Sequence, residues 1–408
     1  MIAQILFLVI LGAGVFLFTK KVREVIRNIN LGRDVKINDR PSERWAVMAK
    51  VAMGQSKMGA RPVAAFFHVL IYVGFIIINI EVLEIIIDGL FGTHRVLSFM
   101  GGFYDFLIGS FEILALGVLA ACVVFLARRN VLRIKRFTMR EMTSWPRTDA
   151  NLILITEIFL MTAFLLMNAA DSILQTRGAE HYITAGSFPV SAMFIPILSG
   201  MSTDALILLE RGCWWFHIVG ILAFLNYVPY SKHFHILLAF PNTWYSKLTP
   251  KGQLTNMESV MNEVKLMMDP SAVPPPADPN AAPQRFGAKD VKDLTWKQLM
   301  DSYSCTECGR CTSSCPANLT GKILSPRKIM MDTRDRLEEV GKNINQHGAD
   351  HDDGKSLLND YISPEELWAC TSCNACVEAC PVLIDPLSII VDMRRYMVME
   401  QSAAPTEL

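Results

Sequence analysis

Two cysteine tracts in the last third of the chain constrain its fold more than any other feature. The first reads Cys-Thr-Glu-Cys-Gly-Arg-Cys-Thr-Ser-Ser-Cys-Pro from Cys305, and the second reads Cys-Thr-Ser-Cys-Asn-Ala-Cys-Val-Glu-Ala-Cys-Pro from Cys370. Both follow the spacing C-x2-C-x2-C-x3-C-P, which is typical of bacterial iron–sulfur proteins. The alternatives are zinc knuckles or disulfides, but zinc sites normally use cysteines in pairs. The spacing therefore favours iron–sulfur clusters.

The same spacing predicts how the eight cysteines divide between two [4Fe–4S] clusters. Three thiolates on a tight loop each reach one iron of a cluster, and the fourth, just before a proline, ligates the other cluster. The first cluster is predicted to have the ligands Cys305, Cys308, Cys311 and Cys380. The second cluster is predicted to have the ligands Cys370, Cys373, Cys376 and Cys315.

The chain as a whole is too apolar for an ordinary soluble protein, because 51% of its 408 residues are hydrophobic. Five apolar runs approach or exceed the length that crosses a bilayer. These runs are Ile2–Phe18, Pro62–Asp88, Phe103–Ala127, Asn151–Ala170 and Ala205–Tyr230, the last expected to continue past Pro229. The first run lacks a basic leader and a small-residue cleavage site, so it is interpreted as a retained helix. The sequence predicts an all-α protein with a five-helix transmembrane bundle.

Basic residues between the apolar runs predict the orientation in the membrane. Residues 20–61 hold eleven lysines and arginines and residues 128–147 hold seven, whereas the two loops on the other side contribute Arg95 and Arg177. The positive-inside rule then places the N-terminus outside and the cysteine tracts in the cytoplasm. The chain has no disulfide framework, which agrees with a reducing compartment. The 39 basic and 39 acidic residues balance, so no nucleic-acid partner is indicated.

Composition divides the chain into four parts. Residues 1–240 are predicted to form the transmembrane domain, and residues 287–400 a small α-helical, ferredoxin-like domain in the cytoplasm. Between them, residues 241–286 contain an amphipathic stretch, Leu254–Met268, and a proline-rich linker over 270–283. Residues 401–408 form a tail. Within the cysteine domain, Ser325 followed by proline predicts the start of a helix, and 341–355 is expected to be a solvated loop.

Histidines in the apolar runs are the candidate haem ligands, because titratable residues within a membrane are rare and usually functional. His217 and His235 are 18 residues apart (235 − 217). In one continuous helix they would share a face and lie roughly 27 Å apart. His68 and His235 are paired as ligands of a proximal b-type haem, and His233 is expected to face the opposite way. His217 is assigned to a distal site.

The distal site lacks an obvious second histidine, because Asn79 occupies the same-face position on the second apolar run. Three alternatives are open: a haem held by His217 alone, a loop ligand such as His94, or no distal haem. Acidic residues in the outer halves of the runs are candidates for a proton path or for plain ion pairing. They are Glu81, Glu84, Asp88, Glu112 and Asp171.

These motifs resemble two families of redox proteins. His217-Ile-Val-Gly, the segment from Pro229 to Lys232, and Phe67-His68-Val69 resemble the gamma subunit of respiratory nitrate reductase. The cysteine tracts resemble the iron–sulfur part of heterodisulfide reductase, whose membrane cytochrome b is of the same group. Membrane proteins that link electron-transferring flavoprotein to menaquinone are similar in joining both modules. Two departures stand out: Ile78 replaces the family's second histidine on this helix, and the Cys-Cys-Gly motifs of heterodisulfide reductase are absent.

The combined interpretation is a membrane electron conduit in a prokaryotic cytoplasmic membrane. We expect it to pass electrons between a cytoplasmic partner, two [4Fe–4S] clusters, a b-type haem and a quinone, as the quinone-reactive subunit of an oxidoreductase. The resemblance implies menaquinone, with a Cys-Cys-Gly-domain subunit or electron-transferring flavoprotein as the partner. The alternatives are a membrane-tethered iron–sulfur redox sensor without haem, or the iron–sulfur subunit of a glycolate or glycerol-phosphate type dehydrogenase.

Overall fold

The computed structural model describes residues 1–269, 271 and 285–406, so nearly all of the predicted proline-rich linker lies outside the described residues. The structure is 70% helical. Within the described ranges, backbone pairing of the β type is limited to two isolated bridges, Arg33 with Thr295 and Leu358 with Ile362. The all-α prediction is therefore confirmed.

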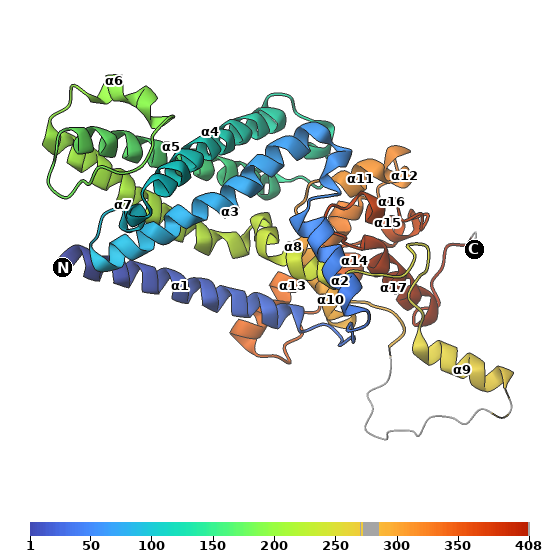
Figure 1. The fold of residues 1–408 in the computed structure, drawn as a ribbon. Coiled ribbons are helices and arrows are strands. Elements are labelled where there is room, and N and C mark those ends of the chain that lie inside the picture. The colour runs from blue at the N-terminus through green and yellow to red at the C-terminus, as the bar shows by residue number, and fades with distance from the viewer. Residues whose placement is uncertain (270, 272–284, 407–408) are drawn as a thin grey trace. The chain divides into compact units, whose positions relative to one another are not determined.

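Five long helices correspond to the five apolar runs (Figure 1). They are α1 (Ile2–Ile29), α3 (Pro62–Phe91), α4 (Gly102–Asn130), α5 (Ser144–Thr176) and α7 (Thr203–Tyr227). Each is long and apolar enough to cross a membrane, the last with the turn that continues it to Tyr230. The helices extend beyond the apolar runs because polar residues at their ends continue the same backbone hydrogen bonds. The predicted set of five membrane helices is confirmed.

The expected continuation of the fifth helix past Pro229 is wrong. The α-helix ends at Tyr227, a 3-10 turn covers Val228–Tyr230, and Ser231 is extended with φ −116° and ψ 156°. Proline has no backbone N–H and therefore removes a helical hydrogen bond at this point. A new helix, α8, begins at His235 and ends at Trp244. His217 and His235 therefore do not share one helix, and their spacing no longer places them on one face.

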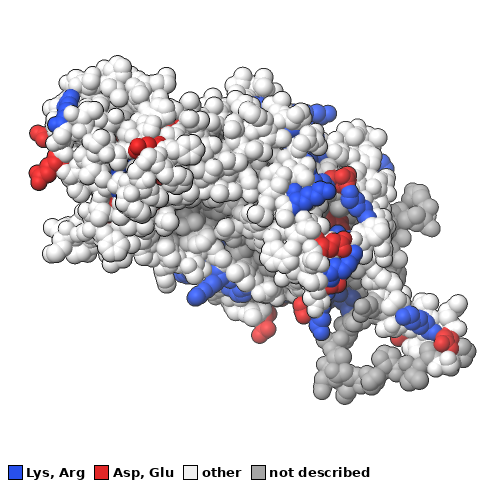
Figure 2. All heavy atoms as spheres, viewed as in Figure 1, with Lys and Arg blue, Asp and Glu red and all other residues white. Residues whose placement is uncertain are grey.

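Two compact units make up the chain. The first comprises Met1–Val22 and Met58–His233, and the second comprises Arg23–Lys57 and Phe234–Leu408. Besides the long helices, the first unit contains the short helix α6 (Ile195–Leu198). The charged side chains seen in Figure 2 are sparse along the visible face of the long helices and gather on the second unit.

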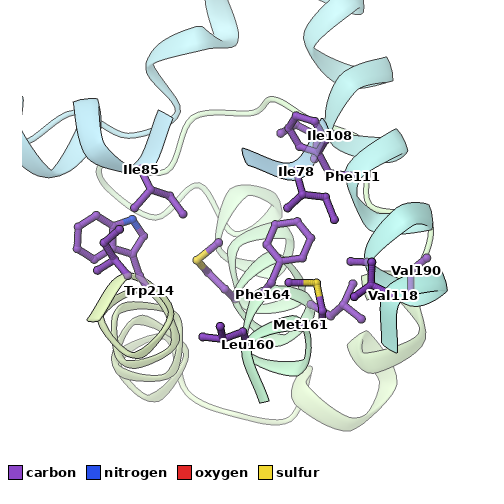
Figure 3. Packing of buried hydrophobic residues seen from close by; sticks show 14 of the residues in the cluster. Ile78, Ile85, Ile108, Phe111, Val118, Leu160, Met161, Phe164, Val190 and Trp214 are labelled. Carbon is purple, nitrogen blue, oxygen red and sulfur yellow. The ribbon is translucent and has the colours of Figure 1, made fainter. Parts of the chain in front are cut away.

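The core of the first unit lies between α3, α4, α5 and α7. Figure 3 shows Ile78 and Ile85 of α3 pointing toward Phe164 of α5 and Trp214 of α7. All four side chains are buried, and Phe164 is fully enclosed. Ile78 is thus part of the apolar packing between these helices.

Short helices build the second unit around α13 (Pro326–His347), a single longer helix. Ser325 caps α13, its hydroxyl accepting from the backbone N–H of Lys328 as the sequence predicted, but the helix continues to His347 and takes up the start of the expected loop over 341–355. The other helices are α2 (Pro41–Met48), α9 (Glu258–Met268), α10 (Trp296–Ser304), α11 (Arg310–Ser314), α12 (Pro316–Leu319), α14 (Leu357–Asp360), α15 (Pro364–Trp368), α16 (Ala375–Ala379) and α17 (Pro386–Met399).

The basic segment after α1 packs against the cysteine-rich part of the second unit. The amide of Asn28 donates to the hydroxyl of Tyr303 at 3.1 Å, and the backbone N–H of Arg33 donates to Leu294 at 2.7 Å. A side chain at Gly32 would place its Cβ 2.7 Å from the backbone nitrogen of Trp296, so the two chain segments approach as closely as glycine permits. The segment expected to be a basic loop is therefore folded onto the domain that carries the cysteines.

Candidate functional site

The two cysteine tracts adopt the same backbone conformation. The residue before the second cysteine is left-handed in each tract, with φ 53° at Glu307 and 56° at Ser372. The residue after it is also left-handed, with φ 69° at Gly309 and 58° at Asn374. Glycine and asparagine tolerate this conformation better than other residues. The doubled sequence motif therefore produces a doubled loop geometry.

Each loop leads into a five-residue helix that carries the third cysteine and ends at the fourth. The helices α11 and α16 begin directly after Gly309 and Asn374 and give way to extended backbone, with ψ 118° at Cys315 and 125° at Cys380. Proline follows the fourth cysteine in both tracts and cannot continue the preceding hydrogen-bond pattern. The fourth cysteine thus leaves the loop that holds the first three.

One cavity collects cysteines from both tracts. Cys305, Cys308 and Cys311 line it together with Cys380, and the enclosed space, including its solvent-open mouth, is about 360 Å³. Four thiol sulfurs around one space fit the donor set of a [4Fe–4S] cluster. The set is the one predicted from the spacing, with the fourth member taken from the other tract.

The remaining four cysteines form the complementary group. Burial raises the pKa of Cys370 and of Cys376, and both thiols interact electrostatically with Cys315. Cys373 is exposed. The assignment of these four cysteines to the second cluster stays a prediction from the spacing.

Burial and backbone donors set the state of the thiols. Burial raises the pKa of Cys305 to about 11 and the pKa values of Cys376 and Cys380 to about 12, so without metal these thiols are neutral at pH 7. Metal ligation must displace their protons. The backbone N–H of Ile384 donates to the sulfur of Cys380 at 3.3 Å, and that of Ser372 to the sulfur of Cys370 at 3.4 Å. Such donors also stabilise thiolate charge.

All ten cysteines lie in the described part of the chain and are free of disulfides. Among the described residues, no three cysteine, histidine or carboxylate side chains converge on a position for a single metal ion.

Two arginines that the cysteine spacing does not predict also line the cavity. They are Arg310, next to Gly309 in the first tract, and Arg327, the second residue of α13. Arg327 is fully buried. The sequence carries no signal for this position, because the burial of Arg327 depends on how α13 packs.

His217 has the hydrogen bonding of a metal ligand. Its ring is buried, and its Nδ1 lies 3.1 Å from the carbonyl oxygen of Leu160. Because a carbonyl can only accept, Nδ1 carries the proton and Nε2 has a lone pair. That Nε2 is buried and has no hydrogen-bond partner among the described residues. This arrangement is common in metal-binding histidines.

The other histidines belong to different environments. His68 lies on α3 in the first unit, whereas His235 begins α8 in the second, so the predicted haem pair is drawn from both units. The ring of His233 lies 5.4 Å from that of Phe224. His94, the suggested loop ligand, has its Nε2 3.4 Å from a carboxylate oxygen of Asp171. His94 thus contacts a carboxylate of the first unit.

A buried polar network lies at one end of the first unit. Arg95 was counted as an outer loop charge, but it is buried and donates to Asp171 at 2.6 Å, to Asn168 at 3.0 Å and to the Tyr104 hydroxyl at 3.1 Å. The Tyr104 hydroxyl in turn donates to Glu84 at 2.9 Å. A charge in a loop between membrane helices can therefore be structural.

Two other carboxyls of this region differ sharply in their partners. Glu112 accepts from the backbone N–H groups of Val190 and Ser191 at 2.8 and 3.0 Å and from the amide of Asn168 at 3.1 Å. Glu81 is also buried, but its Oε2 has no hydrogen-bond partner among the described residues. Glu112 therefore anchors a loop, whereas Glu81 has no such structural role in the described contacts.

Comparison with known proteins agrees with the cysteine geometry. Residues 304–384 match the family model of the 4Fe-4S dicluster domain. The C-terminal part of the chain contains a 4Fe-4S dicluster domain. One protein of the ferredoxin/F(420)H(2)-dependent CoB-CoM heterodisulfide reductase of Methanosarcina acetivorans is 35% identical to the chain over 29% of its length, and the match covers 60% of that relative. The predicted resemblance to heterodisulfide reductase is confirmed.

Two longer relatives match nearly the whole chain. A Bacillus subtilis protein, described as the probable iron-sulfur-binding oxidoreductase FadF, is 29% identical over 97% of the chain, which covers 56% of it. The EtfAB:quinone oxidoreductase of Syntrophomonas wolfei is 26% identical over 92% of the chain, which covers 51% of it. The chain thus spans about half the length of these relatives. No solved structure matches the chain.

Proposed function

We propose that the protein is a membrane-bound electron-transfer subunit that carries two [4Fe–4S] clusters and exchanges electrons with a quinone. The observation that carries this proposal is the cavity lined by three cysteines of one tract and Cys380 of the other. Its relatives are iron–sulfur oxidoreductases, which supports an electron-transfer role for the family of sequences. When bound, such clusters exchange single electrons.

Eight cysteines would hold the two clusters. Cys305, Cys308, Cys311 and Cys380 would ligate the first, and Cys370, Cys373, Cys376 and Cys315 the second. The protein's own contribution is to fix these sulfurs through the two repeated loops and to exclude water from most of them. Exposure of Cys373 gives the second site the more open position, which suits exchange of electrons with a soluble partner.

The proposed orientation has the N-terminus outside and the dicluster domain in the cytoplasm. The basic segment from Arg23 to Lys57 belongs to the same compact unit as the cysteine domain, so both would lie on the same side of the membrane. Lysines and arginines favour the cytoplasmic side. A reporter fused after Leu408 should be active in the cytoplasm, and one inserted at Gly92 should be active outside. The opposite pattern would overturn the orientation.

A b-type haem is proposed in the membrane domain, with His68 and His235 as its ligands by resemblance to the nitrate reductase gamma subunit. The broken helix before His235 removes the spacing argument for this pair but leaves the resemblance. His217 fits a ligand chemically through its buried, unpartnered Nε2, although Ile78 occupies the place of its counterpart on α3. A quinone, menaquinone by the same resemblance, would be the membrane substrate.

The soluble partner is proposed to be a redox protein on the cytoplasmic side of the membrane. One of these relatives is named an EtfAB:quinone oxidoreductase, which supports an electron-transferring flavoprotein as donor or acceptor. A protein with Cys-Cys-Gly motifs is the second candidate, because the cysteine domain of the chain matches a component of heterodisulfide reductase. Copurification of the complex from native membranes would identify the partner.

Anaerobically prepared membranes that contain the protein provide the test. Reduction with dithionite should give the electron paramagnetic resonance signal of reduced [4Fe–4S] clusters and a b-type absorbance band, and an added menaquinone analogue should reoxidise both. Membranes from cells that lack the protein are the control. Iron–sulfur signals without a haem band would contradict the haem part of the proposal and leave a membrane iron–sulfur protein. The absence of both signals would contradict the whole proposal.

A further inference from the structure

Arg327 is the most deeply buried charged side chain of the cysteine domain. It is fully enclosed and lines the cavity of Cys305, Cys308, Cys311 and Cys380. A guanidinium stays charged at any pH at which proteins are stable. Burying such a charge is costly unless its surroundings compensate, so its place in a cavity of cysteines calls for a physical reason.

The backbone around Arg327 is fixed to the first cysteine tract. Its N–H donates to the hydroxyl of Thr312 at 3.3 Å, and Thr312 exchanges a 2.8 Å hydrogen bond with Ser325, the cap of α13. Its Nη1 lies 3.3 Å from the carbonyl oxygen of Glu307, which sits between the first two cysteines. The guanidinium therefore lies against the loop that would hold the cluster.

Glu307 and Arg334 form an ion pair close to the first two cysteines. The carboxylate of Glu307 is buried and lies 2.7 Å from the guanidinium of Arg334, a residue of α13. The guanidinium groups of Arg327 and Arg310 bring positive charge to the cavity wall. A cluster held by four thiolates is anionic and gains a further negative charge on reduction, so a nearby buried cation favours the reduced form.

We propose that Arg327 is a tuning residue that raises the reduction potential of the first cluster, a role that rests on the proposed ligation by the four cysteines. Burial alone would lower the reduction potential of the first cluster, because water stabilises the more negatively charged reduced form more than the oxidised form. The reduction potential of the second cluster would depend on other residues. Cys373 is exposed, and Arg394 is half-buried and donates to the carbonyl groups of Leu367 and Cys370. The two clusters would thus be tuned separately.

The test is a redox titration followed by electron paramagnetic resonance, on the full-length protein purified in detergent with its clusters intact. In Arg327→Gln, the equilibrium constant for reducing the first cluster should fall at least tenfold, equal to about 59 mV for one electron. Arg327→Lys keeps the charge and should restore most of the shift. The second cluster should not change in either variant, whereas Arg394→Gln should move only the second.

Thr333→Val is the matched control, because it removes a buried hydrogen bond within α13, from the Thr333 hydroxyl to the carbonyl oxygen of Ile329, without changing any charge. It should leave both potentials unchanged. An unchanged first potential in Arg327→Gln, or an equal shift in Arg327→Lys, would overturn the proposal. If Arg327→Gln fails to take up iron, the Arg327→Lys variant provides the test. A normal iron content and a normal first-cluster potential in Arg327→Lys would support the role of the charge, whereas the same loss of iron would contradict it. Absence of iron from the wild-type protein would instead contradict the proposed function.

Discussion

Sequence spacing predicts a grouping for the cysteines of the two tracts and for the histidines of the apolar runs. The structure brings the predicted cysteines together, whereas it breaks the helix on which the histidine prediction depends. The cysteine spacing acts within loops of a few residues, and the structure gathers Cys305, Cys308, Cys311 and Cys380 around one cavity. The histidine spacing needed an unbroken helix from His217 to His235, and the helix ends at Tyr227. Spacing therefore predicts which residues lie together only where the backbone between them keeps one regular conformation.

The largest predicted effect tests the exchange of the fourth cysteine between tracts. In Cys380→Ser, the cluster of the first tract should be lost or badly damaged while the cluster of the second tract persists, because Cys380 lies with Cys305, Cys308 and Cys311. Electron paramagnetic resonance of the reduced protein would follow both signals.

Cys122→Ser is the control for this variant, since Cys122 is buried in α4 far from either tract in sequence and should change neither signal. Loss of the second cluster alone in Cys380→Ser would mean that each tract supplies all four of its own ligands.

The second prediction concerns the histidines. His68→Ala and His235→Ala should each abolish one b-type haem band in dithionite-reduced difference spectra, because an axial ligand is removed. His233→Ala is the matched control, two residues away in the turn before α8, and should keep the band. His217→Ala should spare this haem. If His233→Ala removes the band and His235→Ala does not, the break after Tyr227 has exchanged the roles of the two residues.

The features that the sequence predicts correctly are those set by residues close together in the chain. The membrane helices follow from runs of apolar residues, and the start of α13 follows from Ser325 and Pro326. The repeated loops follow from the cysteine spacing, with Gly309 and Asn374 at the positions that require left-handed backbone.

Features that depend on packing could not be derived from the sequence. Nothing in the local pattern shows that Arg95 is buried against Asp171, or that Arg327 faces the cysteine cavity. The docking of 23–57 on the cysteine domain depends on contacts such as that of Asn28 with Tyr303, whose partners are far apart in the chain. The end of the fifth helix is the exception, because Pro229 marks it in the sequence.

A smaller effect is expected from the buried network of the first unit. Arg95→Met should lower the stability of the membrane domain by about 3–5 kcal/mol, because it leaves the buried carboxylate of Asp171 without its closest cation. Glu81→Gln keeps the shape of a side chain that lacks a partner at Oε2, and should change stability by less than about 1 kcal/mol.

Thermal unfolding in detergent would compare these two variants directly. Equal losses would show that Glu81 has a structural role like that of the other buried carboxyls, whereas a loss confined to Arg95→Met would separate it from them.

Iron and acid-labile sulfide analysis of the anaerobically purified wild-type protein tests the central claim most directly. Two cubane clusters predict about eight iron and about eight sulfide per chain, in addition to any haem iron. Stoichiometric zinc with little sulfide, or only about half of the expected iron and sulfide in fully loaded protein, would contradict the account of two clusters that share their cysteines.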